Sequence, residues 1–235
     1  NIDIAAILLS ALLHDNGQMG FNNNFMINSK SELSLIYNDI NVLENYHASE
    51  GYKAIQKYDL LKIDASKHKI FRQRLISMII ATDPVNHSKV NGLIKNKLAN
   101  KNEEENNDVI KCILNEQKLV EDQQDLMNFF ISFSDTAHSC KDFEITFEWT
   151  SRLMEEFWHQ GDIEKKLELP VSFLCERKDA YVGKGQIGFI QAIILPTVNT
   201  LLSICPKLSF FMDKLDDNIS KWNNYLEEIE KNKSK

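Results

Sequence analysis

Two adjacent residues near the start of this sequence, His14 and Asp15, have the clearest capacity for chemistry. Together they offer an imidazole nitrogen and a carboxylate, a ligand pair that suits Zn²⁺ or Mn²⁺ and leaves room for a second, oxygen-preferring ion such as Mg²⁺. His-Asp dipeptides also occur by chance in many globular chains, where they are structural or solvated. The pair by itself therefore only raises the hypothesis of a metal site.

Further residues follow this dipeptide in a pattern typical of one enzyme family. Gln18 and Asn23 stand where its signature has His and Asn. Later blocks follow in the family's order: Tyr37-Asn38-Asp39 with Val42-Leu43-Glu44-Asn45-Tyr46-His47, Trp149-Thr150 with Met154-Glu155-Glu156-Phe157 and Gln160-Gly161-Asp162, and Leu174-Cys175-Glu176-Arg177-Lys178 with Gly185-Gln186-Ile187-Gly188-Phe189-Ile190. In these residues the chain resembles the class I cyclic-nucleotide phosphodiesterase catalytic domain. Several of the sequence blocks are most similar to those of its calcium/calmodulin-dependent branch.

The resemblance implies a two-metal site for Zn²⁺ and Mg²⁺ (or Mn²⁺). Two metal ions suit the reaction because hydrolysis of a cyclic phosphodiester needs a nucleophile at neutral pH and stabilisation of charge on the phosphoryl oxygens. The implied metal ligands are His14, Asp15 and Asp135. The implied catalytic residues, which match groups that hold the water ligands of the second ion, are Glu44, His47 and Thr82.

The resemblance also implies a binding site for the purine base. Gln186 would bind the edge of the base, because its amide offers a donor and an acceptor and can meet adenine or guanine. Phe189, which offers a stacking face, and the aliphatic Leu153 would hold the base between them, with His138 near the substrate. Without the resemblance, Phe189 and Leu153 would be read as core residues, and His138 as a surface histidine.

Three departures from the family pattern bear on activity. Gly17 and Gln18 stand where the family has Asp and His, and Tyr46 replaces a His. Gln cannot ionise, and loss of such a partner typically costs about 10–100-fold in affinity or activity. We therefore expect metal-dependent hydrolysis of cAMP, cGMP or both, with metal occupancy weakened by Gln18. The alternative is a catalytically degenerate subunit of the same fold that binds nucleotide or acts as a scaffold.

The general acid of the family has no counterpart in this sequence. It lies, with a further metal-binding His, on a helix well before the His-Asp pair, whereas only 13 residues precede His14 here. We therefore expect the general-acid His upstream of Asn1, and a catalytic domain that is N-terminally incomplete. Another HD-type phosphohydrolase is disfavoured, because the block that carries the purine site is present.

Composition and periodicity favour an all-α fold, a compact domain of many helices. The chain has only eight Gly and four Pro, and its apolar residues recur at intervals of three and four. The spacing predicts a buried helix over 71–81 that ends before Pro84, another over 187–204, and a packing helix over 210–230. One catalytic domain is expected over 1–231, with a mobile polar loop around 96–108 and a frayed tail at 232–235.

Net charge, apolar stretches and cysteine content indicate which partners and which cellular location to expect. A net charge of −7 argues against nucleic acid, which needs a basic surface. No membrane span is expected, because Gln191 and Pro196 interrupt the longest apolar stretch. The four cysteines form no disulfide pattern, so we expect a reducing, cytoplasmic location. The resemblance makes a cyclic nucleotide the expected partner, and a homodimer or larger complex stays open.

Overall fold

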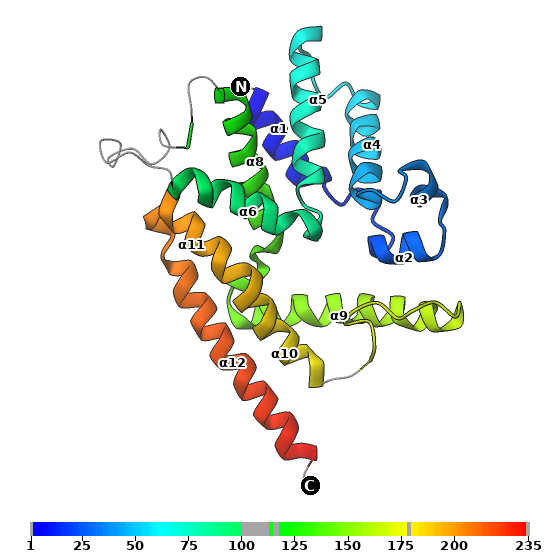
Figure 1. The fold of residues 1–235 in the computed structure, drawn as a ribbon, viewed down its shortest axis with the longest axis vertical. Coiled ribbons are helices and arrows are strands. Elements are labelled where there is room, and N and C mark those ends of the chain that lie inside the picture. Colours follow the sequence, from blue (N-terminus) through cyan, green and yellow to red (C-terminus); the bar gives the residue numbers. More distant parts are fainter. Residues whose placement is uncertain (1, 100–112, 115–117, 178–179, 234–235) are drawn as a thin grey trace. The chain divides into compact units, whose positions relative to one another are not determined.

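The computed structural model describes residues 2–99, 113–114, 118–177 and 180–233, and this part of the chain is helical without any β-strand (Figure 1). The all-α prediction is therefore confirmed. The elements are α1 (Ile2–Leu13), α2 (Asn23–Asn28), α3 (Glu32–Ile36), α4 (Val42–Lys57), α5 (Ala65–Ile80), α6 (Pro84–Ala99), α8 (Leu119–Thr136), η3 (Ala137–Cys140), α9 (Phe143–Lys166), α10 (Ala180–Phe189), η4 (Ile190–Ile194), α11 (Leu195–Ile204), η5 (Pro206–Leu208) and α12 (Phe210–Lys233).

The chain divides into two compact units, Asn1–Asp135 and Thr136–Lys235, which we call unit 1 and unit 2. The sequence predicted one domain over 1–231, and that grouping stays a prediction.

Helix α5 forms the centre of unit 1. Asp64 begins it by accepting a hydrogen bond from the backbone N–H of Lys67 at 2.9 Å, which satisfies one of the free amides of the first turn. Its apolar face carries Phe71 and Leu75, both fully buried in a core shared with α1, α4 and α8. The buried helix predicted over 71–81 is thus the second half of α5.

A buried arginine ties α5 to its neighbours in unit 1. The side chain of Arg74 is 7% exposed, and its Nε lies 2.7 Å from a carboxylate oxygen of Asp3 on α1. Its guanidinium also donates to the side chains of Gln123 and Gln124 on α8, each at 3.3 Å. A buried charge is tolerated only when it is paired and hydrogen-bonded, and this arginine has both kinds of partner.

Helix α6 was not predicted from the sequence, and its last turn lies where a loop was expected. Asp83 accepts from the N–H of Val85 at 2.9 Å, and Pro84 occupies the first helical position. The Asp-Pro pair thus lies between α5 and α6, and α5 ends before it as the sequence predicted. The predicted mobile loop at 96–108 is wrong for 96–99, which form the last turn of α6. Lys97 holds that turn by ion pairs with Asp122 and Asp125 of α8. Residues 100–108 lie outside the described part of the chain.

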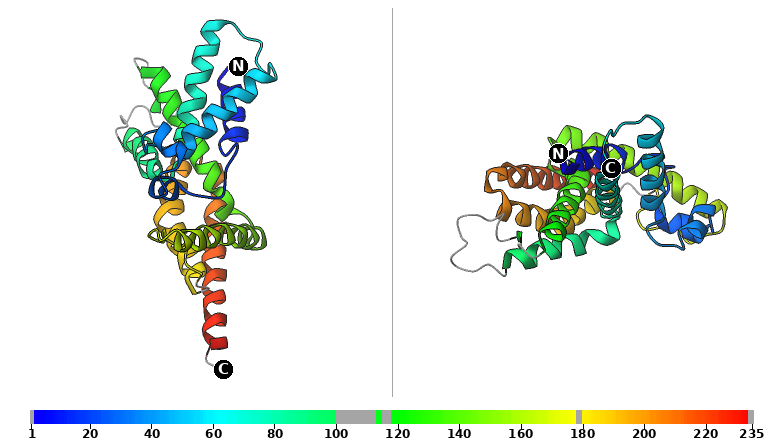
Figure 2. Two further views of the ribbon diagram at one scale, coloured as in Figure 1. Left: turned by 90° about the vertical axis from the view of Figure 1, so that its right-hand side faces the viewer. Right: turned by 90° about the horizontal axis from the view of Figure 1, so that it is seen from above.

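The main helices of unit 2 are α9, the continuous run α10–η4–α11, and α12, which lies alongside that run (Figures 1 and 2). The short elements η3 and η5 also belong to this unit. Trp222 of α12 is fully buried against the aromatic rings of Phe143 and Phe147 on α9. Asn218, also fully buried, donates to the carbonyl oxygens of Ser139 at 2.8 Å and Lys141 at 2.9 Å. The packing helix predicted over 210–230 is confirmed, but α12 continues to 233, so the predicted tail is helical at 232–233.

The predicted apolar helix over 187–204 belongs to the run α10–η4–α11. Its middle part, η4, is a π-helical turn, a feature that is rare and often occurs at functional sites. By length and composition alone, residues 182–204 could cross a membrane, with a mean hydropathy of 1.8. Core helices pass the same test, so this finding is weak evidence for a span.

Candidate active site

A tight turn after α1 presents His14 and Asp15 side by side. The N–H of Asn16 donates to the carbonyl of Leu13 and the N–H of Gln18 to that of Asp15, both at 3.0 Å. Gly17 completes the turn with φ +82°, a left-handed conformation that a glycine adopts without steric cost.

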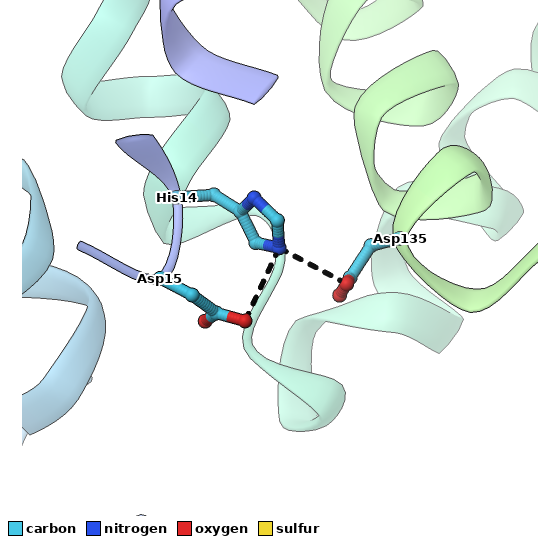
Figure 3. Close-up of side chains that lie close together, drawn as sticks. All are labelled: His14, Asp15 and Asp135. Atoms are coloured by element: carbon cyan, nitrogen blue, oxygen red, sulfur yellow. Dashed lines mark hydrogen bonds and ion pairs between the residues drawn. The ribbon is translucent and has the colours of Figure 1, made fainter. Parts of the chain in front are cut away.

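At this turn the adjacent side chains of His14 and Asp15 meet that of Asp135, which lies far away in the sequence (Figure 3). The Nε2 atom of His14 lies 3.3 Å from a carboxylate oxygen of Asp15 and 3.2 Å from one of Asp135, on the last turn of α8. One ligand atom from each residue lies within 4.8 Å of the others. The structure therefore brings together the three residues that the sequence singled out as metal ligands, all within unit 1.

The electrostatics at this point favour a cation. Hydrogen bonds that the imidazole donates to the carboxylates of Asp135 and then Asp15 raise the pKa of His14 to about 11, against the opposing effect of burial. The Nδ1 atom of His14 donates to the carbonyl of Ala11 at 2.9 Å, which directs Nε2 toward the two carboxylates. One imidazole nitrogen with two carboxylate oxygens is a donor set that fits a zinc-like or manganese-like ion.

Helix α4 supplies His47 and Glu44 next to this cluster. His47 is 2% exposed; its Nδ1 donates to the carbonyl of Asn16 at 3.0 Å, and its Nε2 lies 3.9 Å from Asp15. Burial lowers the pKa of His47, so the neutral form with a free Nε2 lone pair is favoured. Burial raises the pKa of Glu44, although a hydrogen bond from Asn23 partly opposes this shift.

Sequence reasoning did not assign roles to three polar residues around Glu44. Asn23 donates to Glu44 at 2.9 Å and accepts from the N–H of Leu43 at 2.9 Å. Its Nδ2 also lies 3.4 Å from Asp83, a 4% exposed carboxyl group that accepts from Asn41 at 2.5 Å. The available signals were the position of Asn23 in the signature and the Asp-Pro helix start at 83.

For Thr82 and Gln18, the described hydrogen bonds of the side chain are with backbone groups nearby in the sequence. The hydroxyl of Thr82 donates to the carbonyl of Ile79 at 2.7 Å, at the end of α5. The amide oxygen of Gln18 accepts from the N–H of Met19 at 2.9 Å, and the residue is exposed. The roles proposed for Thr82 and Gln18 therefore stay predictions.

In unit 2, the predicted base-binding glutamine has an unused polar atom. Gln186 is 7% exposed, and within the described part of the chain its buried Oε1 has no hydrogen-bond partner. The rings of Phe189 and His138 lie nearly parallel, 6.3 Å apart at an angle of 14°. Leu153 is half-buried on α9. A buried acceptor without a donor is costly, so the geometry suits a ligand that supplies one.

A cavity of about 520 Å³ adjoins Gln186 in the chain. Its volume lies within the usual range for small-molecule sites, about 300–1,000 Å³. The lining is mostly apolar, with one acidic and one basic side chain. It consists of Val171, Ser172, Phe173, Leu174, Glu176, Lys184 and Gly185.

Comparison with known proteins places this geometry in context. The model of the family described as 3′5′-cyclic nucleotide phosphodiesterase matches residues 1–215. A probable 3′,5′-cyclic-AMP phosphodiesterase of Caenorhabditis elegans is 31% identical over 222 residues, which are 93% of this chain and 32% of the relative. The dual specificity calcium/calmodulin-dependent 3′,5′-cyclic nucleotide phosphodiesterase 1C of Mus musculus is 33% identical over 211 residues, 88% of this chain and 28% of the relative.

Two solved structures that resemble this chain are also phosphodiesterase domains. The crystal structure of the phosphodiesterase domain of a RhoPDE fusion protein from the choanoflagellate Salpingoeca rosetta is similar with a TM-score of 0.83 and 29% identity, covering 98% of this chain and 71% of that one. A second structure of the phosphodiesterase domain of the Salpingoeca rosetta rhodopsin phosphodiesterase gives a TM-score of 0.84 at 28% identity, with 99% and 69% covered. This chain spans a third or less of the two curated relatives described above.

Proposed function

We propose that this chain, which belongs to the 3′5′-cyclic nucleotide phosphodiesterase family, is a metal-dependent enzyme that hydrolyses cAMP, cGMP or both to the 5′-monophosphates. In this reaction water forms a new bond to phosphorus, the bond between phosphorus and the 3′ oxygen breaks, and the 3′ oxygen takes up a proton.

The convergence of His14, Asp15 and Asp135 is the observation that carries the proposal. His14 and Asp135 are 121 positions apart, yet a nitrogen and two carboxylate oxygens meet at one point. These residues would hold the metal ions, Zn²⁺ with Mg²⁺ or Mn²⁺. When bound, such ions supply a nucleophile at neutral pH and positive charge opposite the phosphoryl oxygens.

Neighbouring polar residues of unit 1 would orient the metal ligands and the water molecules bound to the metal ions. His47 is fixed by its bond to the Asn16 carbonyl, so its Nε2 faces Asp15 with a lone pair. Asn23 fixes Glu44 at the start of α4, since it donates to the Glu44 carboxyl group and accepts from the N–H of Leu43. Residues that orient metal ligands and their waters typically contribute about 10–100-fold to affinity or activity.

In unit 2, Gln186 and Phe189 would bind the base. The buried Oε1 of Gln186 accepts a hydrogen bond from an amino group or ring N–H of the purine, and the ring of Phe189 offers a stacking face. Because the amide can present either a donor or an acceptor, this residue by itself accommodates adenine and guanine alike.

A second candidate function is a catalytically degenerate subunit that binds nucleotide or acts as a scaffold. The observation that favours it is the turn at Gly17 and Gln18, where a titratable pair of the family is replaced by a glycine and a neutral amide that bonds only to the adjacent backbone among its described contacts.

Metal binding and hydrolysis distinguish the two candidates. Calorimetric titration with Zn²⁺ and Mg²⁺, followed by assays of cAMP and cGMP turnover, should show metal binding that Asp135→Asn weakens by about 10–100-fold or more. Asp213→Asn, which changes an exposed acid of α12, is the matched control. Metal binding that is unaffected by Asp135→Asn would refute the assignment, and nucleotide binding without turnover would favour the subunit.

A further inference from the structure

The segment after α9 is fastened to that helix by a buried carboxyl group. Glu164 is 1% exposed, and its Oε2 accepts the backbone N–H of Ser172 at 2.7 Å. Its Oε1 accepts the hydroxyl of Ser172 at 2.6 Å and the amide of Gln160 at 2.8 Å. Three donors thus converge on one side chain, two of them from the same residue of the segment.

Two further contacts fasten the same segment along α9. A Cβ atom on Gly161 would lie 1.9 Å from the carbonyl oxygen of Cys175, so the backbone of the segment rests directly on this glycine. Arg177 donates to Asp162 at 3.0 Å and to Glu155 at 3.2 Å. The segment is therefore anchored at residues 172, 175 and 177.

The residues between these anchors line the 520 Å³ cavity, whose lining also includes Gly185, the residue before Gln186. Leu174 has φ +62°, a left-handed conformation that is unfavourable for leucine and has to be held by its surroundings. Its side-chain atoms lie 3.6 and 3.9 Å from the position that a Cβ on Gly185 would take. Contacts thus run from Glu164 through Ser172 and Leu174 to the residue that precedes Gln186.

We propose that Glu164 is a positioning residue for nucleotide binding: it fixes the 169–177 segment on α9, and this segment keeps the cavity beside Gln186 in the shape that admits the purine base. The inference rests on the proposed function, because it takes the base to bind at Gln186. It explains why a carboxyl group is buried here, since only an acceptor with two oxygens satisfies all three donors.

Glu164→Gln tests this role with almost no change in volume. The new NH₂ group would face at least one of the three donors, so it should release the backbone of Ser172. We expect AMP and GMP, product nucleotides that cannot be turned over, to bind about tenfold more weakly in calorimetric titrations. In the turnover assay the KM should rise while kcat stays within twofold, and hydrogen exchange at the amide of Ser172 should become faster.

A double-mutant cycle shows whether Glu164 acts through the segment. Ser172→Ala deletes one hydroxyl and should weaken nucleotide binding by about threefold in the parent but by less in the Glu164→Gln background. Should Glu164→Gln fail to fold, Ser172→Ala carries the same prediction alone. Glu156→Gln, an exposed change on the same helix, is the control.

The outcomes separate the inference from the function it rests on. If the parent binds AMP or GMP and both variants bind as tightly as Glu156→Gln does, the positioning role is overturned and the proposed function stands. If exchange at Ser172 accelerates without loss of affinity, the anchor exists but does not shape the binding site, which also overturns the inference. If the parent binds neither nucleotide, the proposed function fails and the inference fails with it.

Discussion

The ring of Tyr46 fills the space that a side chain on Gly17 would need: a Cβ there would lie 3.1 Å from Tyr46 Cε1 and 3.2 Å from its hydroxyl oxygen. Two of the three departures from the family pattern are therefore physically linked. The glycine leaves room for the tyrosine, and the tyrosine ring would have to shift by a few tenths of an ångström to admit the aspartate that the resemblance places at position 17.

Gly17→Ala should lower the free energy of unfolding by about 1–2 kcal/mol, because the left-handed backbone disfavours any Cβ and the Tyr46 ring obstructs it. Gly92→Ala is the matched control: Gly92 lies within α6 with open space around its Cβ position, so alanine should stabilise by about 0.5–1 kcal/mol. Urea unfolding of both variants measures this. A neutral or stabilising Gly17→Ala would show that the turn and ring are not as close as described.

Restoring the family's residues at positions 17 and 18 should require a change at Tyr46. We expect Gln18→His alone to raise metal affinity or hydrolysis, within the 10–100-fold range typical of groups beside a metal site. Adding Gly17→Asp should give no further gain unless Tyr46→His removes the obstructing ring. Metal titration and cyclic-nucleotide turnover of the single, double and triple variants test this order, with Gln73→His on the exposed face of α5 as control. High parental turnover would contradict the idea that Gln18 weakens the site.

Lys97→Met should destabilise unit 1 by about 2–4 kcal/mol, because it removes the ammonium group that pairs with the 6% exposed carboxylate of Asp122. Burial opposes the charge on Lys97, but hydrogen bonds to Asp122 and Asp125 outweigh it and raise its pKa. A lysine with a raised pKa in the folded state contributes its full stability below its unfolded pKa and loses it only at higher pH. The difference from the parent should thus be constant between pH 6 and 9 in urea unfolding, while exposed Lys95→Met should have little effect; a difference that fades below pH 9 would contradict this.

His87 should make the protein sensitive to mild acid. It is 7% exposed and shares a 3.0 Å hydrogen bond between its Nδ1 and the hydroxyl of Ser132, and burial lowers its pKa. Its neutral form is favoured in the folded state, so stability is present above the unfolded pKa and falls as pH drops below about 6.5, by at most about 1.4 kcal/mol per pH unit for one proton. His87→Gln should flatten that slope relative to exposed His159→Gln, and equal slopes in the two variants would refute the assignment.

Several features could be read from residues close together in the chain. The helical spacing of Phe71, Leu75 and Met78 predicted the buried face of α5, and the Asp-Pro pair at 83–84 predicted where that helix ends. The error at residues 96–99 has a specific cause: a polar stretch near the end of α6 is read as a loop, but Lys97 stabilises it through acids on α8 that follow much later in the sequence.

The sequence by itself determined the family, the all-α class and the identity of candidate ligands, because helical periodicity and short motifs depend on residues only a few positions apart. Only the tertiary structure decided which of these side chains meet. The approach of Asp135 to His14, the bonds from Asn23 to Glu44 and toward Asp83, and the burial of Glu164 under Ser172 arise from how helices and loops pack. Packing depends on the combined shapes and partners of many distant residues, and no single stretch of sequence specifies it.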